Sequence, residues 1–360
     1  MIDKKRTRMT FCVFFFSALI ITGLAMLYKD AKGASMNTRS RESLAMDTIM
    51  RISIHSAKAP EELDMILDGA FGIIADLDGH LSMHMTSSDI SLVNANAGQS
   101  PVLVSKETAS AVRTSLAIAQ RTGGAFDPTI GPVSDIWKTR SVENPRGEVP
   151  DDAEIREALS LVGASMAHVS ADNRIYLEKQ GMKLDLGGIA KGYASGAVRD
   201  FLISAGVESA LIDLGGNVVV IGTAPGRAKG DPWRIGIQHP YRPRGEIICS
   251  IAANGTSVIT AGVYERYVEI GGKKYTHIFD PRTGHPVDGD LISVTIVAED
   301  PAAGDALSTA FMAIGVEKSK KLLDSFPGVE AIFITKGQGA EPDVTATEGI
   351  KGLIKNEAKG

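Results

Sequence analysis

The chain has 360 residues and a nearly balanced charge, with 38 Lys and Arg against 43 Asp and Glu and a net charge of −5. That balance argues against a basic face for nucleic acid, and an aromatic content of 6% argues against a base-stacking surface. The length is sufficient for a sizeable core in one large domain or two lobes. Of the two cysteines, only Cys249 lies beyond the N-terminal hydrophobic run, so no intrachain disulfide is expected in the mature part.

Residues 1–33 have the pattern of an export signal or an N-terminal membrane anchor. Four basic residues lie within positions 4–8, and residues 9–28 form an uncharged, largely apolar run. The run is long for a cleaved signal and close to the roughly 20 residues that span a bilayer. Cleavage before Ala34 and retention as an anchor both remain open, and in either case the domain that follows is expected to be exported. Cys12 lies inside the run, too early for a lipid anchor. We interpret residues 34–45 as a linker.

After the linker, the chain combines helices with short strands. Apolar residues at helical spacing predict helices over residues 60–77, 108–121, 152–161, 189–205, 304–314 and 316–326. Alternating patterns predict strands over residues 48–55, 209–222 (one bulged strand or two), 233–238, 245–252, 291–298 and 331–334. Because the strands neither alternate strictly with helices nor form long parallel runs, we expect an α+β fold of mixed, largely antiparallel sheets with packed helices. Residues 46–337 are assigned to the domain and residues 338–360 to a flexible C-terminal tail.

The segment Leu184-Asp-Leu-Gly-Gly-Ile-Ala-Lys191 has the pattern of a strand end, a glycine turn and a helix start. A helix N-terminus preceded by glycines presents free amides and a positive dipole end, which suits a phosphate group. Lys191 adds a cation one turn into the helix, and Asp185 stands at the end of the strand. An ordinary turn with a surface lysine fits this segment equally well.

Three further segments carry side chains that could bind a ligand or take part in catalysis. Asp305 and Thr309 are four residues apart at the start of a predicted helix, a spacing that suits Mg²⁺, although Asp305 also fits the role of an N-cap. His277 lies in a predicted strand that runs into a Pro/Gly turn, three residues before Asp280, where it is a candidate general base or a structural histidine. Asp127 lies in a rigid loop before Pro128, either as a ligand-binding residue or as a turn-former.

Taken together and in this order, the four segments resemble the ApbE family of flavin transferases over residues 46–334. The resemblance implies an ApbE-like fold with a flavin cleft. It implies Mg²⁺-dependent transfer of FMN from FAD to a Ser or Thr hydroxyl of an acceptor flavoprotein, with release of AMP. The implied acceptors are flavin-carrying subunits of membrane redox complexes. The implied location is the periplasmic side of the inner membrane, anchored there or released after signal cleavage.

The same resemblance assigns roles to individual residues. It makes His277 and Asp305 catalytic. It places the metal between the carbonyl of Gly188 and the side chains of Asp305 and Thr309. The positions that it assigns to flavin binding are Met46, Ala125, Phe126, Asp127, Asp185, Lys191 and Ile278, the last through its backbone.

Two positions depart from the family pattern. Asp47 follows Met46 where family members usually carry Gly, and Met83-His84-Met85 occupies a loop where they often have Trp or Tyr. At the second departure, His84 would stack on the flavin more weakly than Trp or Tyr. Two alternative functions fit the same residues: Mg²⁺-dependent hydrolysis of FAD to FMN and AMP, and a non-catalytic flavin-binding role in the envelope.

Overall fold

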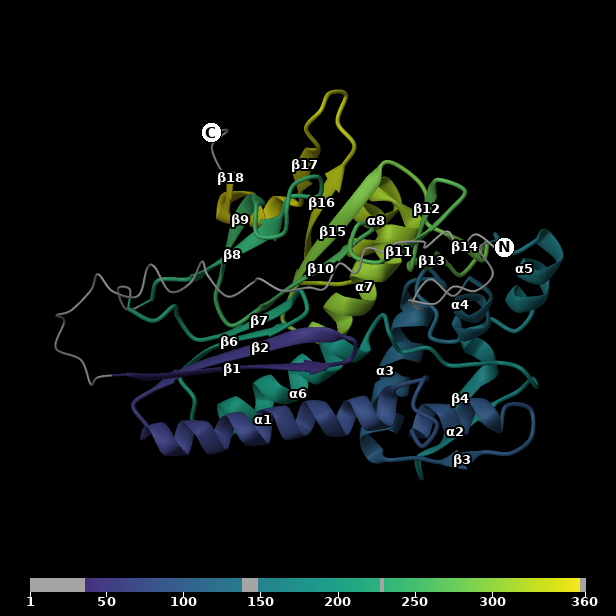
Figure 1. The fold of residues 1–360 in the computed structure, drawn as a ribbon, viewed down its shortest axis with the longest axis horizontal. Helices are drawn as coiled ribbons and strands as arrows, with labels where there is room; N and C mark the ends of the chain where they lie inside the picture. Colours follow the sequence, from purple (N-terminus) through teal and green to yellow (C-terminus); the bar gives the residue numbers. More distant parts are fainter. Residues whose placement is uncertain (1–35, 138–147, 227–229, 357–360) are drawn as a thin grey trace, which may run out of the picture. The chain divides into compact units, whose positions relative to one another are not determined.

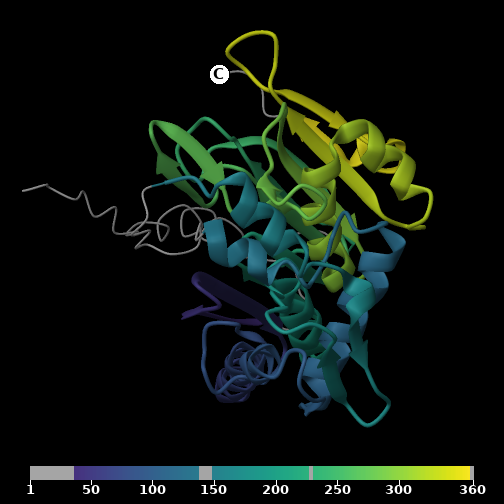
Figure 2. The same ribbon diagram turned by 90° about the vertical axis from the view of Figure 1, so that its right-hand side faces the viewer.

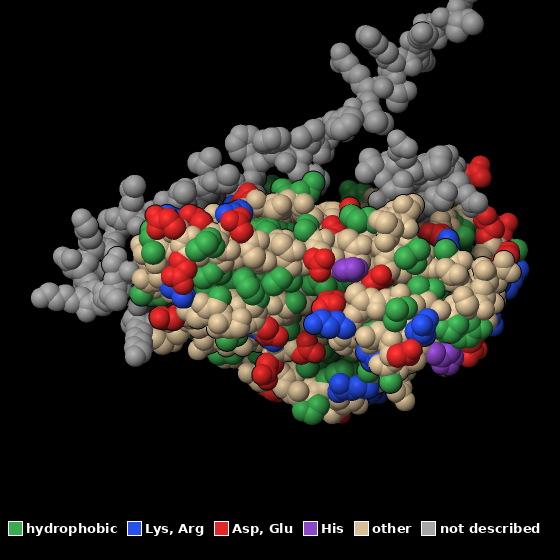
Figure 3. Space-filling model, turned by 90° about the horizontal axis from the view of Figure 1, so that it is seen from below, with side chains coloured by type: hydrophobic (Ala, Val, Ile, Leu, Met, Phe, Trp, Pro, Cys, Tyr) green, Lys and Arg blue, Asp and Glu red, His purple; other side chains and the backbone are tan. Residues whose placement is uncertain are grey.

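The computed structural model describes residues 36–137, 148–226 and 230–356. The predicted export segment, residues 1–33, lies outside these ranges. Within them, no helix has the length and apolar character needed to cross a membrane. On the face drawn in Figure 3, which includes the first long helix, basic side chains are scattered among acidic and apolar ones.

An antiparallel sheet of eight strands forms the centre of the described part (Figure 1). Its spatial order is β1-β2-β6-β7-β10-β15-β16-β17. The hairpin turn at Gly215 and Gly216, both at positive φ, separates two strands, so the predicted segment 209–222 is two strands. The bounds are β1 Asn37–Ala45, β2 Thr48–Ser56, β6 Ser209–Leu214, β7 Asn217–Ile221, β10 Ser257–Gly262, β15 Leu291–Ala298, β16 Glu330–Thr335 and β17 Asp343–Ala346.

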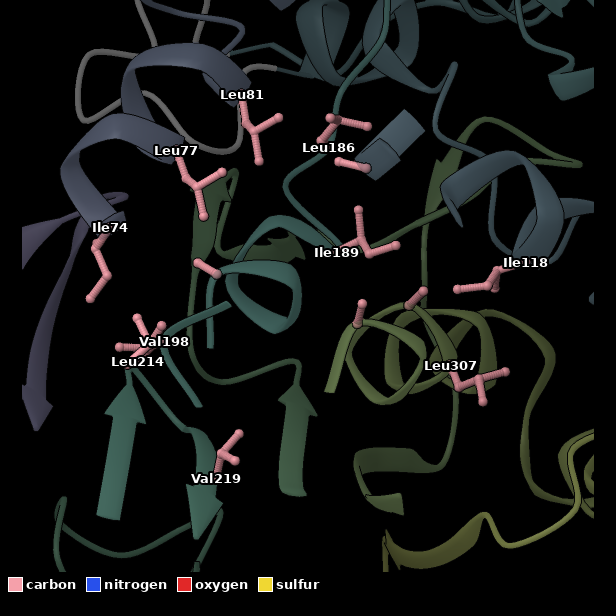
Figure 4. Close-up of a cluster of buried hydrophobic side chains, with 14 of the residues drawn as sticks. Ile74, Leu77, Leu81, Ile118, Leu186, Ile189, Val198, Leu214, Val219 and Leu307 are labelled. Carbon is pink, nitrogen blue, oxygen red and sulfur yellow. The ribbon is translucent and has the colours of Figure 1, made fainter. Parts of the chain in front are cut away.

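Helices cover one face of this sheet and form the main core with it. Figures 1 and 2 show α1 beside β1 and β2, and α7 beside the later strands. In Figure 4, Leu77 of α1, Val198 of α6 and Leu214 of β6 belong to one buried cluster. Burying each such aliphatic side chain stabilises the fold by about 1.5–3 kcal/mol. The helices are α1 Pro60–Leu81, α2 Asp89–Ala95, α3 Lys106–Arg121, α4 Gly131–Trp137, α5 Asp152–Leu159, α6 Ala190–Ser204, α7 Pro301–Ile314 and α8 Val316–Leu323.

Smaller sheets complete the fold. The sheet β18-β9-β8 packs on a second apolar cluster that includes Ile332 and Ile334 of β16. The bounds are β3 Val102–Leu103, β4 Ala167–Val169, β5 Arg174–Leu177, β8 Trp233–Gln238, β9 Ile247–Ala253, β11 Tyr267–Ile270, β12 Lys273–Thr276, β13 Phe279–Asp280, β14 His285–Pro286 and β18 Ile354–Asn356, with short 3₁₀ turns at Ala164–Met166 and Glu348–Leu353. All pairs between named strands are antiparallel, which confirms the predicted α+β fold with largely antiparallel sheets.

Two boundary predictions are wrong. Residues 34–45 are not a linker throughout, because Asn37–Ala45 forms β1 and pairs along its whole length with β2. Residues 338–360 are not a free tail, because β17 pairs with β16 and β18 pairs with β9. In both places the backbone hydrogen bonds of a neighbouring strand order a segment whose own side chains are mostly polar.

Candidate functional site

Asp305 lies on α7 but does not cap that helix. The N-cap is Asp300, whose side chain accepts a hydrogen bond from the amide of Ala302 at 2.9 Å, and Pro301 occupies the first helical position. The helix begins earlier than the predicted residue 304, so the capping interpretation of Asp305 is wrong. Asp305 is instead buried, with 4% of its surface exposed. A buried carboxylate needs polar partners, and these come from α6.

The start of α6 supplies the partners of Asp305. Its Oδ2 accepts a hydrogen bond from the amide of Gly192 at 2.9 Å, and its Oδ1 is 3.9 Å from the ammonium of Lys191. A Cβ at position 192 would lie 2.6 Å from the Cβ of Asp305, so only glycine permits this approach of the two helices. The Gly192 amide donates to Asp305, not to the carbonyl of Gly188 four residues earlier, the usual helical acceptor.

Gly188 and Thr309 lie next to each other. A Cβ at Gly188 would be 3.2 Å from the hydroxyl oxygen of Thr309 and 3.2 Å from the Phe126 ring. The Thr309 hydroxyl donates weakly to the Asp305 carbonyl, at 3.4 Å. No group of three or more His, Cys, Asp or Glu suited to a metal occurs among the described residues. The donors here are a carbonyl, a carboxylate and a hydroxyl. This set fits Mg²⁺, which binds few protein oxygens and keeps positions for water and phosphate.

Asp185 is held against the loop 124–130 and the helix α4 that follows it. It is 3% exposed, and its carboxylate accepts hydrogen bonds from the Ser134 hydroxyl at 2.9 Å and the Gly187 amide at 2.8 Å. The Asp185 amide donates to the Pro128 carbonyl at 2.8 Å. Just before it, the side chain of Asn94 bonds both the amide and the carbonyl of Leu184, at 2.7 and 3.0 Å. Residues 184–186 form no strand, and Lys183 makes only an isolated bridge with Ile130, so the predicted strand end is wrong. Segments distant in sequence instead fix the stretch that precedes the glycine turn. Ser134 was not identified from the sequence, because its partner is 51 positions away.

Asp127 and the two residues before it are buried in the same loop. Ala125 and Phe126 are each 3% exposed. One carboxylate oxygen of Asp127 accepts from the amide and hydroxyl of Thr129, at 2.8 and 2.6 Å, and the other accepts from the Ala164 amide at 2.9 Å. These bonds support the interpretation of Asp127 as a turn-former.

His277 lies between β12 and β13. Its ring Nδ1 and its backbone amide both contact the carbonyl of Arg266, at 2.9 and 3.2 Å. A carbonyl only accepts, so Nδ1 carries the proton in this contact and Nε2 is the basic nitrogen of the neutral ring. Asp280 shapes the following turn, since its carboxylate binds the guanidinium of Arg282 at 2.8 and 2.7 Å. Ile278 is 4% exposed, and its carbonyl accepts from the Val287 amide at 2.9 Å.

The β1–β2 turn lies near the His277 segment. Met46 and Asp47 have φ of 46° and 58°, the pattern of a two-residue hairpin turn. Asp is among the residues that tolerate this backbone region, which explains how Asp47 replaces the glycine usual in the family. The Met46 amide donates to Asp78 at 3.0 Å, and the Arg266 guanidinium donates to the Asp47 carbonyl at 2.8 Å. Arg266 was also not identified from the sequence, because only its contacts in the structure distinguish it from other arginines.

Met83 and His84, which stand where family members often have Trp or Tyr, border a cavity of about 260 Å³. The cavity is also lined by Asn94 and by the ion-paired Asp135 and Lys183. Since Asn94 bonds Leu184, this cavity flanks the segment that carries Asp185. Neither Met nor His provides a large aromatic stacking surface there.

Comparisons with known proteins agree on one family. The ApbE family model matches residues 46–333. The FAD:protein FMN transferase of Treponema pallidum is 32% identical over 334 residues, covering 90% of this chain and 91% of that protein. The protein of the same name from Klebsiella pneumoniae is 36% identical over 269 residues, covering 74% and 81%. The crystal structure of the ApbE protein of Thermotoga maritima superposes with a TM-score of 0.78 at 32% identity, covering 88% of this chain and 99% of that one. The chain therefore belongs to the ApbE family of enzymes.

Proposed function

We propose that this protein transfers FMN from FAD to a Ser or Thr hydroxyl of an acceptor flavoprotein and releases AMP. The names of the similar enzymes from Treponema pallidum and Klebsiella pneumoniae support FAD as the donor and a protein as the acceptor. The observation that carries the proposal is the buried Asp305 carboxylate, bound to the N-terminus of α6 beside Lys191. A cation beside a site for a divalent metal suits recognition of a diphosphate.

The metal-binding residues are proposed to be Gly188, through its carbonyl, Asp305 and Thr309. Bound Mg²⁺ would offset the charge of the diphosphate. Lys191 adds a second positive charge on the same side of α6, where it contacts Asp305 across 3.9 Å. The proposal assigns flavin contacts to Met46, Asp185, Ala125 and Phe126, while Asp127 holds the loop that carries the last two.

His277 is proposed as the general base. Its Nε2 would take the proton of the acceptor hydroxyl while the hydroxyl oxygen attacks the phosphorus of the FMN half of FAD. The bond between that phosphorus and the bridging oxygen breaks, and AMP leaves with the bridging oxygen. The Arg266 carbonyl supports this role, because it keeps the ring proton on Nδ1. FMN then remains as a phosphoester of the acceptor.

The acceptors are proposed to be flavin-carrying subunits of membrane redox complexes. This partner choice requires export of the enzyme, which the basic and apolar N-terminal sequence supports. The enzyme would then act on the periplasmic side of the inner membrane, anchored there or released.

A gel assay tests the function. The full chain is incubated with FAD, Mg²⁺ and a flavin-acceptor domain, and the denatured acceptor band is examined for flavin fluorescence and for an FMN-sized mass increase. We expect a fluorescent acceptor with the wild type, and none after EDTA treatment or in His277→Ala. His285→Ala is the matched control, because this exposed histidine lies eight residues later in β14 and contacts the Trp137 ring. Release of free FMN and AMP with a dark acceptor band would support hydrolysis. Binding of FAD without either product would leave only a flavin-binding role.

A further inference from the structure

Arg266 contacts two separate parts of the candidate site. Its backbone carbonyl accepts from both the ring Nδ1 and the amide of His277, at 2.9 and 3.2 Å. Its guanidinium donates to the backbone carbonyl of Asp47 at 2.8 Å, across 219 positions of sequence. One residue therefore joins the proposed base to the turn that carries Met46.

The hairpin before His277 depends on such contacts for its position. Strands β11 and β12 form a two-stranded sheet of their own, in which Tyr267 pairs with Thr276. This register places Arg266 and His277 opposite each other at the base of the hairpin. No ladder hydrogen bonds tie the two strands to the central sheet in the described ranges. The Tyr275 ring packs on Trp137 with ring centroids 5.3 Å apart, which holds the β12 side of the hairpin.

The turn at the other end of the Arg266 contact is itself fixed. Both of its residues have positive φ, a backbone region that few non-glycine residues adopt. The Met46 amide is held by Asp78 of α1 at 3.0 Å. The Asp47 carbonyl is therefore a stationary acceptor on the edge of the central sheet, and the Arg266 guanidinium can transmit that position to the hairpin.

We propose that Arg266 is a positioning residue that fixes the His277 imidazole relative to the Met46 turn. This inference rests on the proposed function, in which His277 is the general base of flavin transfer. The guanidinium sets where the segment lies, and the carbonyl of the same residue sets the orientation and the protonated nitrogen of the imidazole. Arg266 itself does not need to contact FAD or the acceptor.

The test compares three variants of the full chain in the flavin-transfer assay. Arg266→Met keeps an apolar stem of similar length and removes the donors, and Arg266→Lys keeps one cationic donor. Arg113→Met is the matched control, since the Arg113 guanidinium also donates to a distant backbone carbonyl, that of Ser170 at 2.7 Å. The rate constant kcat, the KM for FAD and the melting temperature are measured for each variant.

A variant in which the His277 imidazole is misplaced but the substrate contacts are kept has a lower kcat and an unchanged KM. We expect kcat to fall on the order of 10–100-fold in Arg266→Met, the range for a small misplacement of a reacting group. Arg266→Lys should recover part of the rate, and Arg113→Met should keep all of it.

The results separate the two proposals. If the wild type transfers flavin and Arg266→Met does so at the wild-type rate, the positioning role is wrong and the proposed function stands. The positioning role is also wrong if KM for FAD rises in step with the loss of kcat, if Arg266→Lys recovers nothing, or if Arg113→Met loses as much. If the wild type itself transfers no flavin, the proposed function fails and the positioning role fails with it.

Discussion

Asp300 at the N-cap of α7 and Asp305 within that helix have different surroundings, and this difference separates the capping role of Asp300 from the role proposed for Asp305. Asp300 is exposed and caps α7, whereas Asp305 is buried against Gly192 and Lys191. In Asp305→Asn the amide oxygen can still accept from Gly192, so the fold is kept while the charge for Mg²⁺ is lost. We expect flavin transfer to fall on the order of 100-fold or more, as for the loss of several kcal/mol of metal-derived stabilisation.

Asp300→Ala is the matched variant for this prediction. It should cost about 0.5–2 kcal/mol of unfolding free energy, the usual value for a lost N-cap, and keep the transfer activity. Urea unfolding and the gel assay measure the two quantities. Wild-type transfer by Asp305→Asn would remove Asp305 from the proposed metal site.

Asp213, in the β6–β7 hairpin, gives a prediction about pH. Burial raises the pKa of its carboxyl above the ordinary 3.8, although the Gly216 amide donates to it at 2.9 Å. The folded state thus binds this proton more tightly than the unfolded state, so the group lowers stability as the pH rises from about its ordinary pKa through the raised one. Asp213→Asn should therefore gain stability relative to wild type at pH 7, and the gain should shrink toward acid pH.

For the exposed Asp172, the pKa shift and its effect on stability have the opposite sign to those of Asp213. The hydrogen bond from the Ser170 hydroxyl lowers the pKa of its carboxyl, so its contribution to stability is present at neutral pH and is lost in acid. Asp172→Asn should be less stable than wild type at pH 7 and lose that difference at low pH. Urea unfolding of Asp213→Asn at pH 7 and pH 4, and of Asp172→Asn at pH 7 and about pH 2, measures the two trends, because the Asp172 contribution is lost only below the ordinary pKa of 3.8. Equal trends in the two variants would contradict the assignment.

At the scale of elements, the approach of α6 to α7 decides whether the site can form. A Cβ at Gly192 would collide with the Pro301 carbonyl and lie 2.6 Å from the Asp305 Cβ, whereas at Gly196 the nearest atom would be 3.8 Å away. Gly192→Ala should push the helices apart, lower the melting temperature and abolish flavin transfer. Gly196→Ala should stabilise the protein by about 0.5–1 kcal/mol, because Ala is the better helix former, and keep activity. Equal behaviour of the two variants in thermal unfolding and transfer assays would show that the contact is unimportant.

Element patterns in the sequence predicted the fold where apolar residues alternate and failed where they do not. The predicted strand 291–298 coincides with β15, whose side chains are mostly buried. Strand β1 was missed because it lies at a sheet edge, and its Arg39 and Arg41 bind Asp64 and Asp68 of α1 where apolar side chains are usual.

The sequence also indicated which segments carry the chemistry, but not how they meet. The start of α7 was misplaced because the Asp300-Pro301 start signal was overlooked, and that error made Asp305 a candidate cap. The Gly192–Asp305 bond joins positions 113 residues apart, and no local pattern encodes it. The roles of Gly188, Asp305 and Thr309 in metal binding remain predictions, of which Asp305→Asn tests one.

At the scale of the whole molecule, the C-terminal residues close the second apolar cluster. Strand β18 pairs with β9, and Ile350, just before it, is 3% exposed in the cluster with Ile332 and Ile334. Ile350→Ala should therefore cost about 2–5 kcal/mol of unfolding free energy, as for other buried aliphatic truncations. Leu353→Ala, three residues later and 44% exposed, should cost much less. Chemical unfolding of the two variants measures the difference. Because the cluster lies on the sheet face opposite α6 and α7, Ile350→Ala should leave KM for FAD unchanged at temperatures where the protein stays folded. Equal, small losses in both variants would mean that residues after 337 are a dispensable tail.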